Sequence, residues 1–572
     1  MKKLTVFGVA FVLIVSLVCV AVSFAQTVPA GQTAGGVTEQ QKIIEKEKKL
    51  EKKIEKARPE ATESLTAEMV ADTGPKVMIK TIKVEGATLM TQADIQAITS
   101  AYEGQELSLR GMQKVADLIT DEYRKKGYAT SRAYLPPQSV REGTLLVRVV
   151  EGKLGDLSIR GNEHFKTALI QKKIELTPGS YFDFSALQRS LVYINEHPDR
   201  KARATLVPGK TPGTTDVVID VQDQVPFHVG LEYDNFASRY LDKDRYSVVL
   251  EHNNLFGFDD KAYLKLLTGN NDYLRQVQGR YTFPINDGFD IGGYFLISDT
   301  ELGKEFADLD AEGKARLYGI FSSIALLNTE RWDVRLTAGF DYKSIKNYLI
   351  GSQTSNDEVR LLKAGIDSDF TDNWGRTIMT GEIGQGIPDI MGGMDDKDSE
   401  ASRTNSGGQF TKFNGYVFRL QALPYEMTLL WKNAFQYTNN NLVASEQFQA
   451  GGPVSVRGYA PAEYYGDRGL YTSPEVSFPI YFLPKQWTVF KQTESWYDTT
   501  RLVLFYDWAQ VHLRNPQAGE QKHNKIDGWG YGLRFNLRDD VSFRVEVGYP
   551  LGHPNSSDGD HAHPWVEFTV KF

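Results

Sequence analysis

More than half of the chain, from Phe227 to Phe572, alternates apolar and polar residues at a period of two. In the segment 531–538, every odd position is aromatic or aliphatic and every even position is glycine, asparagine or arginine. Successive side chains of a strand point to opposite faces, so this segment predicts strands with one apolar and one polar face. Arg544 and Glu546 carry charge on the polar face of the next strand. Such strands are typical of a membrane barrel with a wet lumen.

A soluble β-sandwich has strands of the same period, so the alternation alone leaves both folds open. Three other features favour the barrel: an N-terminal secretory signal, a length of 572 residues and the lack of a long apolar helix after that signal. The 28 Tyr and 30 Phe also suit the aromatic girdles of a barrel.

The N-terminus predicts a signal peptide at residues 1–25. Lys2 and Lys3 precede an apolar run, and Ser23-Phe24-Ala25 supplies small residues for cleavage before Gln26. A transmembrane anchor is the alternative, because the run is long for a signal. Cys19 is the only cysteine, so cleavage would leave a chain without disulfides, a thiol nucleophile or a cysteine metal site.

Residues 26–76 predict a polar linker with one helix at about 39–58, ended by Pro59. Lys and Glu dominate it, and its apolar stripe is narrow: Ile43, Leu50, Ile54 and Ala57. A helix so polar around its circumference is stabilised by i,i+4 pairs and is hydrated on most sides. A solvated spacer helix and a short coiled coil both fit this pattern.

Two similar α+β units are predicted between the helix and the barrel, at residues 77–152 and 153–224. The first has the order β-α-α-β-β: strand Met78–Glu85, helices Thr91–Tyr102 and Ser108–Lys126, and strands Ala129–Tyr134 and Thr144–Val150. The second repeats it: strand Leu157–Ile159, helices Lys166–Glu175 and Phe184–Asn195, and strands Ala202–Val207 and Thr215–Val221.

These repeats resemble POTRA domains, and their motifs resemble those of TpsB proteins, the transporters of two-partner secretion (ShlB/FhaC/HecB-like family, Omp85 superfamily). The matching stretches of the first unit are Tyr123–Tyr128, Arg132–Gln138 and Val149–Gly152. Those of the second unit are Leu206–Gly209, Gly213–Val217 and Val221–Asp223. The resemblance implies a mainly β protein: a 16-stranded transmembrane β-barrel at 225–572, preceded by two periplasmic POTRA domains and an N-terminal helix that plugs the barrel.

A Gly-, Pro- and Tyr-rich stretch, 451–480, interrupts the alternation and predicts a long loop. Within it, Val456-Arg457-Gly458-Tyr459 resembles the VRGY/F motif of the Omp85 superfamily. The resemblance implies that the loop, at about 449–471, folds into the lumen and that Arg457 pairs with an inward carboxylate.

Asp507 is the candidate for that carboxylate. The period of the segment 501–510 places Asp507 on the face opposite Leu504 and Tyr506, hence towards the lumen. Phe505, Asp507 and Ala509 resemble the family pattern F-x-D-x-G, with Ala509 in place of glycine. An unpaired charge in a narrow lumen is costly, and a bidentate arginine–carboxylate pair offsets that cost.

The last strand ends in Phe572, which resembles the signal read by the outer-membrane assembly machinery. Counting back from Phe572 places the Arg457 loop on the outer side of the membrane. It also places the connection 483–500 on the periplasmic side, where it is longer than such turns usually are.

The sequence contains no G-x-x-x-x-G-K-[ST], H-E-x-x-H or G-x-S-x-G motif, so neither an enzyme nor a cofactor is predicted. His561 and His563 share a face of a probable loop and are a weak candidate for a metal site, and no metal is predicted. A net charge of −8 gives no reason to expect nucleic-acid binding.

The predicted function is export of one large unfolded partner protein across the outer membrane of a Gram-negative-type bacterium, with periplasmic POTRA domains capturing a TpsA-like partner. The expected partners are that protein, outer-membrane lipid and lipopolysaccharide, and the assembly machinery during biogenesis; a monomer is expected. An Omp85-type assembly factor that inserts other barrels is the alternative, and a plain diffusion channel or receptor is a third hypothesis.

Overall fold

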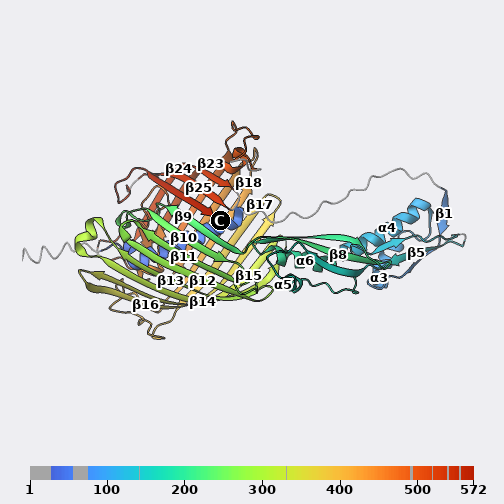
Figure 1. Cartoon of the computed structure of the whole chain (residues 1–572), viewed down its shortest axis with the longest axis horizontal. Coiled ribbons are helices and arrows are strands. Elements are labelled where there is room, and N and C mark those ends of the chain that lie inside the picture. The colour runs from blue at the N-terminus through green and yellow to red at the C-terminus, as the bar shows by residue number, and fades with distance from the viewer. Residues whose placement is uncertain are drawn as a thin grey trace, which may run out of the picture.

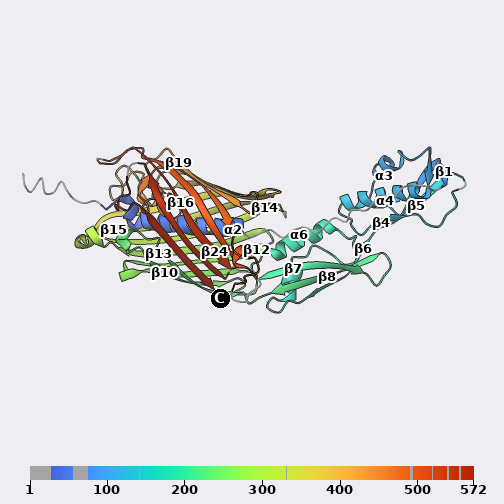
Figure 2. The same cartoon turned by 90° about the horizontal axis from the view of Figure 1, so that it is seen from above.

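The computed structural model describes residues 28–55, 75–140, 142–329, 331–489, 494–517, 519–537, 540–552 and 555–572. The predicted signal peptide and Pro59 lie outside these ranges. A long barrel and two α+β units follow one another along the long axis of the molecule (Figures 1 and 2). No helix in the described ranges is long and apolar enough to cross a membrane.

The first α+β unit packs two helices on a three-stranded sheet of order β2-β5-β4, in which β2 and β5 are parallel. Its elements are β1 (Lys76–Ile79), β2 (Thr81–Glu85), α3 (Gln92–Thr99), β3 (Gln105–Ser108), α4 (Leu109–Lys125), β4 (Arg132–Tyr134) and β5 (Thr144–Val150). The prediction of one strand over Met78–Glu85 is wrong. Lys80 separates β1 from β2 and donates its backbone N–H to Gly143, so that β1 pairs with β3 in a sheet of its own.

The second unit has the sheet order β6-β8-β7. Its elements are β6 (Lys153–Arg160), α5 (Thr167–Gln171), α6 (Phe184–Asn195), β7 (Arg200–Pro208) and β8 (Thr214–Asp223). The helix predicted over Lys166–Glu175 is shorter than expected, since α5 ends at Gln171. Asp183 caps α6 by accepting from the N–H groups of Ser185 and Ala186.

Sixteen strands of the described residues form a closed antiparallel barrel in chain order, and β26 pairs with β9 to close it. The predicted fold class is confirmed. The strands are β9 (Phe227–Asp234), β10 (Arg245–His252), β11 (Lys261–Gly269), β12 (Leu274–Asn286), β13 (Phe289–Glu301), β14 (Glu312–Asn328), β15 (Trp332–Leu349), β16 (Ser352–Asp372), β17 (Gly375–Gly386), β18 (Thr411–Ala422), β19 (Thr428–Thr438), β22 (Arg468–Pro479), β23 (Thr500–His512), β24 (His523–Leu537), β25 (Val541–Leu551) and β26 (His563–Lys571).

Short elements occur in the connections. They are the 3-10 helices η2 (Ala30–Gln32), η3 (Arg239–Leu241), η4 (Asn270–Asp272), η5 (Lys304–Leu309) and η6 (Ala444–Glu446), the hairpin of β20 (Phe448–Ala450) with β21 (Tyr464–Gly466), and α7 (Trp496–Thr499).

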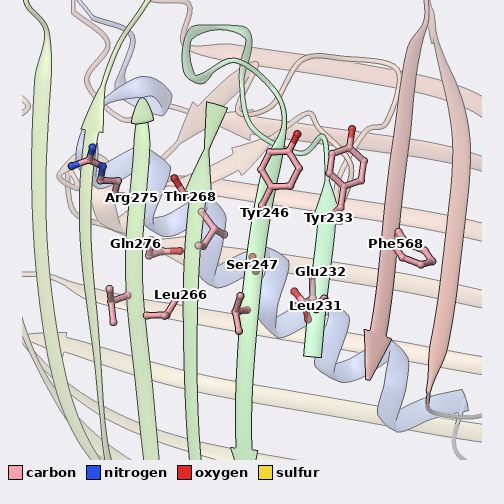
Figure 3. A pocket seen from close by; sticks show the side chains of 13 residues that line it. Leu231, Glu232, Tyr233, Tyr246, Ser247, Leu266, Thr268, Arg275, Gln276 and Phe568 are labelled. Atoms are coloured by element: carbon pink, nitrogen blue, oxygen red, sulfur yellow. The ribbon is translucent and has the colours of Figure 1, made fainter. Parts of the chain in front are cut away.

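The register assigns the two ends of the barrel. Because β9 follows the second α+β unit directly and every strand pair is antiparallel, the β19–β22 connection lies at the end far from the units, and the β22–β23 connection lies at the near end. The outer surface of the barrel is apolar. A groove of about 490 Å³ lies on this surface. Its lining residues Leu231, Tyr233 and Tyr246 face outward, and α2 lies behind the strands (Figure 3).

The helix α2 (Ala34–Glu55) lies inside the barrel (Figure 2). The predicted start at residue 39 is wrong, because the helix begins five residues earlier. Gly35 and Gly36 are poor helix formers, and contacts with the barrel compensate: the Ala34 N–H donates to Asn347 Oδ1 at 2.9 Å. A Cβ on Gly35 would make a tight contact, 3.1 Å from the backbone N of Ser445, and a Cβ on Gly36 would lie 2.2 Å from the carbonyl oxygen of Ala30, where it does not fit.

Candidate functional site in the barrel lumen

The predicted loop folds into the lumen and brings Arg457 against the barrel wall. Arg457 is 1% exposed. Its Nε and Nη2 donate to the two carboxylate oxygens of Asp507 at 2.9 and 2.7 Å, and its backbone N–H donates to the same carboxylate at 3.0 Å. The guanidinium carbon also lies 3.3 Å from the centroid of the Phe505 ring. The two residues singled out in the sequence therefore form a bidentate, buried ion pair.

The other motif residues pack around this pair. Val456 and Tyr459 are fully buried, and Ala509 joins them in one apolar cluster. The methyl group of Ala509 therefore fits where the family pattern has glycine. Gly458 lies so close to β25 that a Cβ there would be 2.6 Å from the carbonyl carbon of Tyr549. Phe572 lies elsewhere: its side chain is 73% exposed, and its backbone pairs with Val229 beside the barrel seam.

Two carboxylates that were not singled out complete the arginine site. Nη1 of Arg457 donates to Glu546 at 2.9 Å and also bonds Glu475. Arg534 bridges the same two glutamates, at 3.0 Å from Glu475 and 2.5 Å from Glu546. The alternation of the segments 531–538 and 544–546 placed Arg534 and Glu546 on the inner face, but nothing in the sequence said which inner charges would meet Arg457. Glu475 lies in the stretch 451–480, which was predicted as a loop. That extent is wrong, because residues 468–479 form the barrel strand β22, which pairs with β19 and β23.

The helix α2 is bound to the wall by ion pairs around its circumference. Glu51 accepts from Lys432 at 3.1 Å and from Arg544 at 2.9 Å. Lys48 lies 2.5 Å from Glu567 and 3.5 Å from Asp234, which belong to the two strands that close the barrel. The apolar stripe is buried as well, since Leu50 and Ile54 pack against strands β17 to β19. Ala57 of the predicted stripe lies outside the described residues.

The helix and the arginine site share one charge network. Lys432 lies 3.1 Å from Glu51 of the helix and 3.8 Å from Glu475 of the arginine site. Arg544 likewise lies 2.9 Å from Glu51 and 3.3 Å from Glu546. If α2 moved away, Lys432 and Arg544 would lose their contact with Glu51. Both side chains would then interact more strongly with Glu475 and Glu546, which are also partners of Arg457.

The same loop also touches the start of the helix. Gln449 Nε2 donates to the carbonyl of Gly36 at 2.8 Å, and Gln32 Nε2 donates to the carbonyl of Pro461 at 3.4 Å. Trp565 Nε1 donates to the carbonyl of Arg457 at 2.8 Å. The loop, the helix and the last strand therefore form one packed body inside the lumen.

The second α+β unit is fixed to the near end of the barrel by buried polar groups. Arg200 is 2% exposed and forms a bidentate pair with Asp259, at 2.7 and 2.6 Å. His197 donates from Nε2 to the carbonyl of Asn253 at 2.6 Å and accepts at Nδ1 from the N–H of Asp199. Burial and the neighbouring Arg200 lower the pKa of His197 to about 4, so the imidazole is neutral at pH 7.

The structure separates the two histidines considered above, since His561 is exposed and His563 is buried. His563 contacts Asp558, with Nε2 3.1 Å from the carboxylate. Asp560 completes a group of three possible ligands, but its carboxylate lies 3.3 Å from Lys243.

Comparisons with known proteins agree with this architecture. The family model of the haemolysin secretion/activation protein ShlB/FhaC/HecB matches residues 213–535, more than half of the chain. The model of the ShlB-type POTRA domain matches residues 77–152.

Similar proteins include two curated transporters. The chain is 23% identical over 502 residues to the heme/hemopexin transporter protein HuxB of Haemophilus influenzae, covering 84% of each. It is 21% identical over 548 residues to the outer membrane transporter CdiB of Escherichia coli, covering 93% of this chain and 89% of the other. The solved structure of CdiB from Escherichia coli superposes with a TM-score of 0.75 and 20% identity, covering 96% of this chain and 100% of that one.

Proposed function

The chain belongs to the ShlB/FhaC/HecB family of haemolysin secretion/activation proteins, and from this premise we propose that α2 is a removable plug and that the Arg457 loop is locked to the wall beside it. As a member of that family, the protein is a two-partner secretion transporter of the outer membrane, with its POTRA domains in the periplasm. The domains are proposed at 77–152 and 153–224, followed by the barrel at 225–572. The exported molecule is one large partner protein, which crosses the membrane unfolded.

One observation carries the proposal of a plug: α2 is held in the lumen by ion pairs rather than by a broad apolar face. Glu51 and Lys48 bond side chains of the wall, while Lys49 and Lys52 are exposed to the space that remains. An ion pair can be exchanged for hydration when the helix leaves, whereas a large buried apolar face could not. This supports a helix that occupies the lumen at rest and leaves during export.

We assign capture of the partner to the free edge of β7 in the second POTRA domain. Among the described residues, β7 pairs only with β8. At one end of this edge, the side-chain amide of Asn195 donates to the carbonyl of Ala202 and accepts from its N–H, so these backbone groups are not available to another strand. Further along the edge, Leu206 and Val207 are 39% and 36% exposed. An extended chain can add to such an edge through its main chain.

The first POTRA domain offers a shorter edge. Its outer strand β4 has three residues, and beyond it Gln138 bonds both the N–H and the carbonyl of Leu146. The side-chain amide of Gln138 thus occupies the place that an added strand would take.

The remaining parts of the proposal concern partners and chemistry. The protein acts as a monomer in outer-membrane lipid and lipopolysaccharide, Phe572 is its signal to the assembly machinery, and transport proceeds without catalysis by this chain. Passenger folding outside the cell drives export.

Single-channel conductance in planar bilayers tests the plug. The full mature protein is compared with a variant that lacks residues 34–55. A higher conductance or open probability of the deletion variant is expected, because the helix occupies part of the lumen. Equal conductance of the two proteins would contradict the plug.

A further inference from the structure

The connection between β22 and β23 stands apart from the other turns at the periplasmic end of the barrel. It runs from Ile480 to Thr499, of which 480–489 and 494–499 are described. The β16–β17 turn, by contrast, consists of two residues. Short periplasmic turns are the rule in such barrels, so a folded connection of this length calls for a function of its own.

The described part of this connection is held by its own hydrogen bonds. Thr488 and Ser495 form a bridge, and the N–H of Trp496 donates to the carbonyl of Trp487 at 2.9 Å. Val489 is fully buried, and the ring of Trp496 lies 5.3 Å from that of Phe535 on β24. The connection is therefore a small packed hairpin against the barrel.

The hairpin is also attached to the neighbouring turn, between β18 and β19. Tyr481 donates its hydroxyl to the carbonyl of Tyr425 at 2.9 Å, and Lys485 lies 3.0 Å from Glu426. Arg501, at the start of β23, donates to the carbonyl of Glu426 at 3.1 Å. These contacts hold the hairpin at a defined angle to the barrel wall.

Despite this packing, the hairpin exposes large aromatic side chains. Phe482 is 85% exposed, Trp487 59% and Tyr481 55%. Tyr425, on the turn to which the hairpin is attached, is 80% exposed, and Trp374 on the β16–β17 turn is 71% exposed. Exposed aromatic groups in an ordered segment mark a surface that is covered by something else.

The surroundings indicate what covers them. The hairpin extends sideways from the end of the barrel nearer the POTRA domains, beyond the wall of strands (Figure 1). The neighbouring strands have an apolar outer surface, on which Leu504 and Trp431 are 49% and 48% exposed. Aromatic rings concentrate at the level of the lipid headgroups, and cations near them contact phosphates. Lys485 and Arg501 supply such cations.

We propose that the described parts of this hairpin, 480–489 and 494–499, lie in the periplasmic leaflet of the outer membrane and bind phospholipid, with Phe482 and Trp487 in the interfacial layer and Lys485 near the phosphates. Because the hairpin is attached rigidly to β22 and β23, this contact sets the depth at which the barrel sits in the bilayer. It thereby also sets the height of the POTRA domains above the membrane. The inference does not depend on which protein is exported.

A single environment-sensitive label tests the inference. Phe482→Cys is introduced into a chain in which Cys19 is removed with the signal or replaced by serine, so that the NBD fluorophore reacts at one position. Lys210→Cys is the control, because Lys210 lies on a hairpin of the second POTRA domain with its side chain 85% exposed. Both proteins are reconstituted into vesicles of phosphatidylethanolamine and phosphatidylglycerol.

The label at position 482 is expected to emit at shorter wavelength than the control. It is expected to lose most of its fluorescence to lipids that carry a nitroxide near the headgroup, and little of it to iodide present on both sides. The control label should show the reverse. Quenching of the 482 label by iodide and not by lipid would overturn the proposal, since the hairpin would then lie in water. Protection from both quenchers would overturn it as well, because it would place protein against Phe482.

Discussion

Replacing Arg457 by alanine removes the cation on which the loop in the lumen depends. Arg457 bonds three carboxylates, but their dependence on it differs. Glu475 and Glu546 keep Arg534, whereas Asp507 keeps, among the residues that the structure describes, the hydroxyl of Ser473 and the N–H of residue 457. The loss is therefore concentrated on one fully buried carboxylate.

The cost follows from that burial. Removing one partner of a buried ion pair costs about 3–5 kcal/mol, because the other charge remains without compensation. At about 1.4 kcal/mol for each factor of ten, the ratio of docked to undocked loop should fall by roughly 100- to 4,000-fold. The sixteen strands keep all their hydrogen bonds, so the barrel itself should still insert.

Two measurements check this prediction. Hydrogen exchange of residues 451–467 reports loop docking, and the amount of partner protein in the medium reports export. Arg457→Ala is expected to speed exchange in the loop and to reduce secretion while heat-modifiable mobility on gels is retained. The double variant Arg457→Ala/Asp507→Ala should lose less docking free energy than Arg457→Ala alone, because no charge is left unpaired. Normal exchange and normal secretion in Arg457→Ala would refute the lock.

Three further predictions concern the seam, the close approach of the loop and the POTRA junction. Lys48→Met should lower the temperature at which the barrel loses heat-modifiable mobility, because β26 and β9 share only five register pairs and Lys48 bridges these two strands. The matched control is Lys49→Met, at an exposed lysine of the same helix. An equal shift in both variants would contradict the bridge. Gly458→Ala should destabilise the docked loop by about 1–3 kcal/mol, seen as faster hydrogen exchange, whereas Gly381→Ala, whose Cβ would meet nothing closer than 3.8 Å, should leave the loop unchanged. The pKa of His197 is lowered to about 4 in the folded protein and is near 6.5 in the unfolded chain. Because the unfolded state binds the proton first, the free energy of unfolding should fall by up to about 3 kcal/mol as pH drops from about 6.5 to about 4. His197→Gln should remove this part of the pH dependence in urea titrations, and an unchanged profile would show that His197 does not titrate this way.

Local patterns in the sequence were sufficient for the elements and for the faces of the strands. The period of two placed Asp507 on the inner face because side chains of a strand alternate, whatever the strand pairs with. The helices predicted to start at the capping residues Thr91 and Ser108 match α3 and α4 to within a few residues, since a cap bonds backbone groups only three residues away. The motif around Arg457 identified the inward loop by resemblance.

Tertiary structure decided everything that depends on which elements meet. The start of α2 at Ala34 was hidden because Gly35 and Gly36 disfavour a helix in isolation, and only the contact with Asn347 and Ser445 compensates. The split of the first strand at Lys80 depends on β3, which is a non-local partner.

The composition of the arginine site shows the same division. Glu546, Arg534 and Arg544 are inward charges by sequence, whereas Glu475 lies in the stretch predicted as a loop and faces inward because residues 468–479 form β22. Their convergence on Arg457 and Glu51 depends on closure of the barrel and on the register between strands far apart in the chain. Alternation determines which way a side chain points, but only the closed barrel determines what it meets across the lumen.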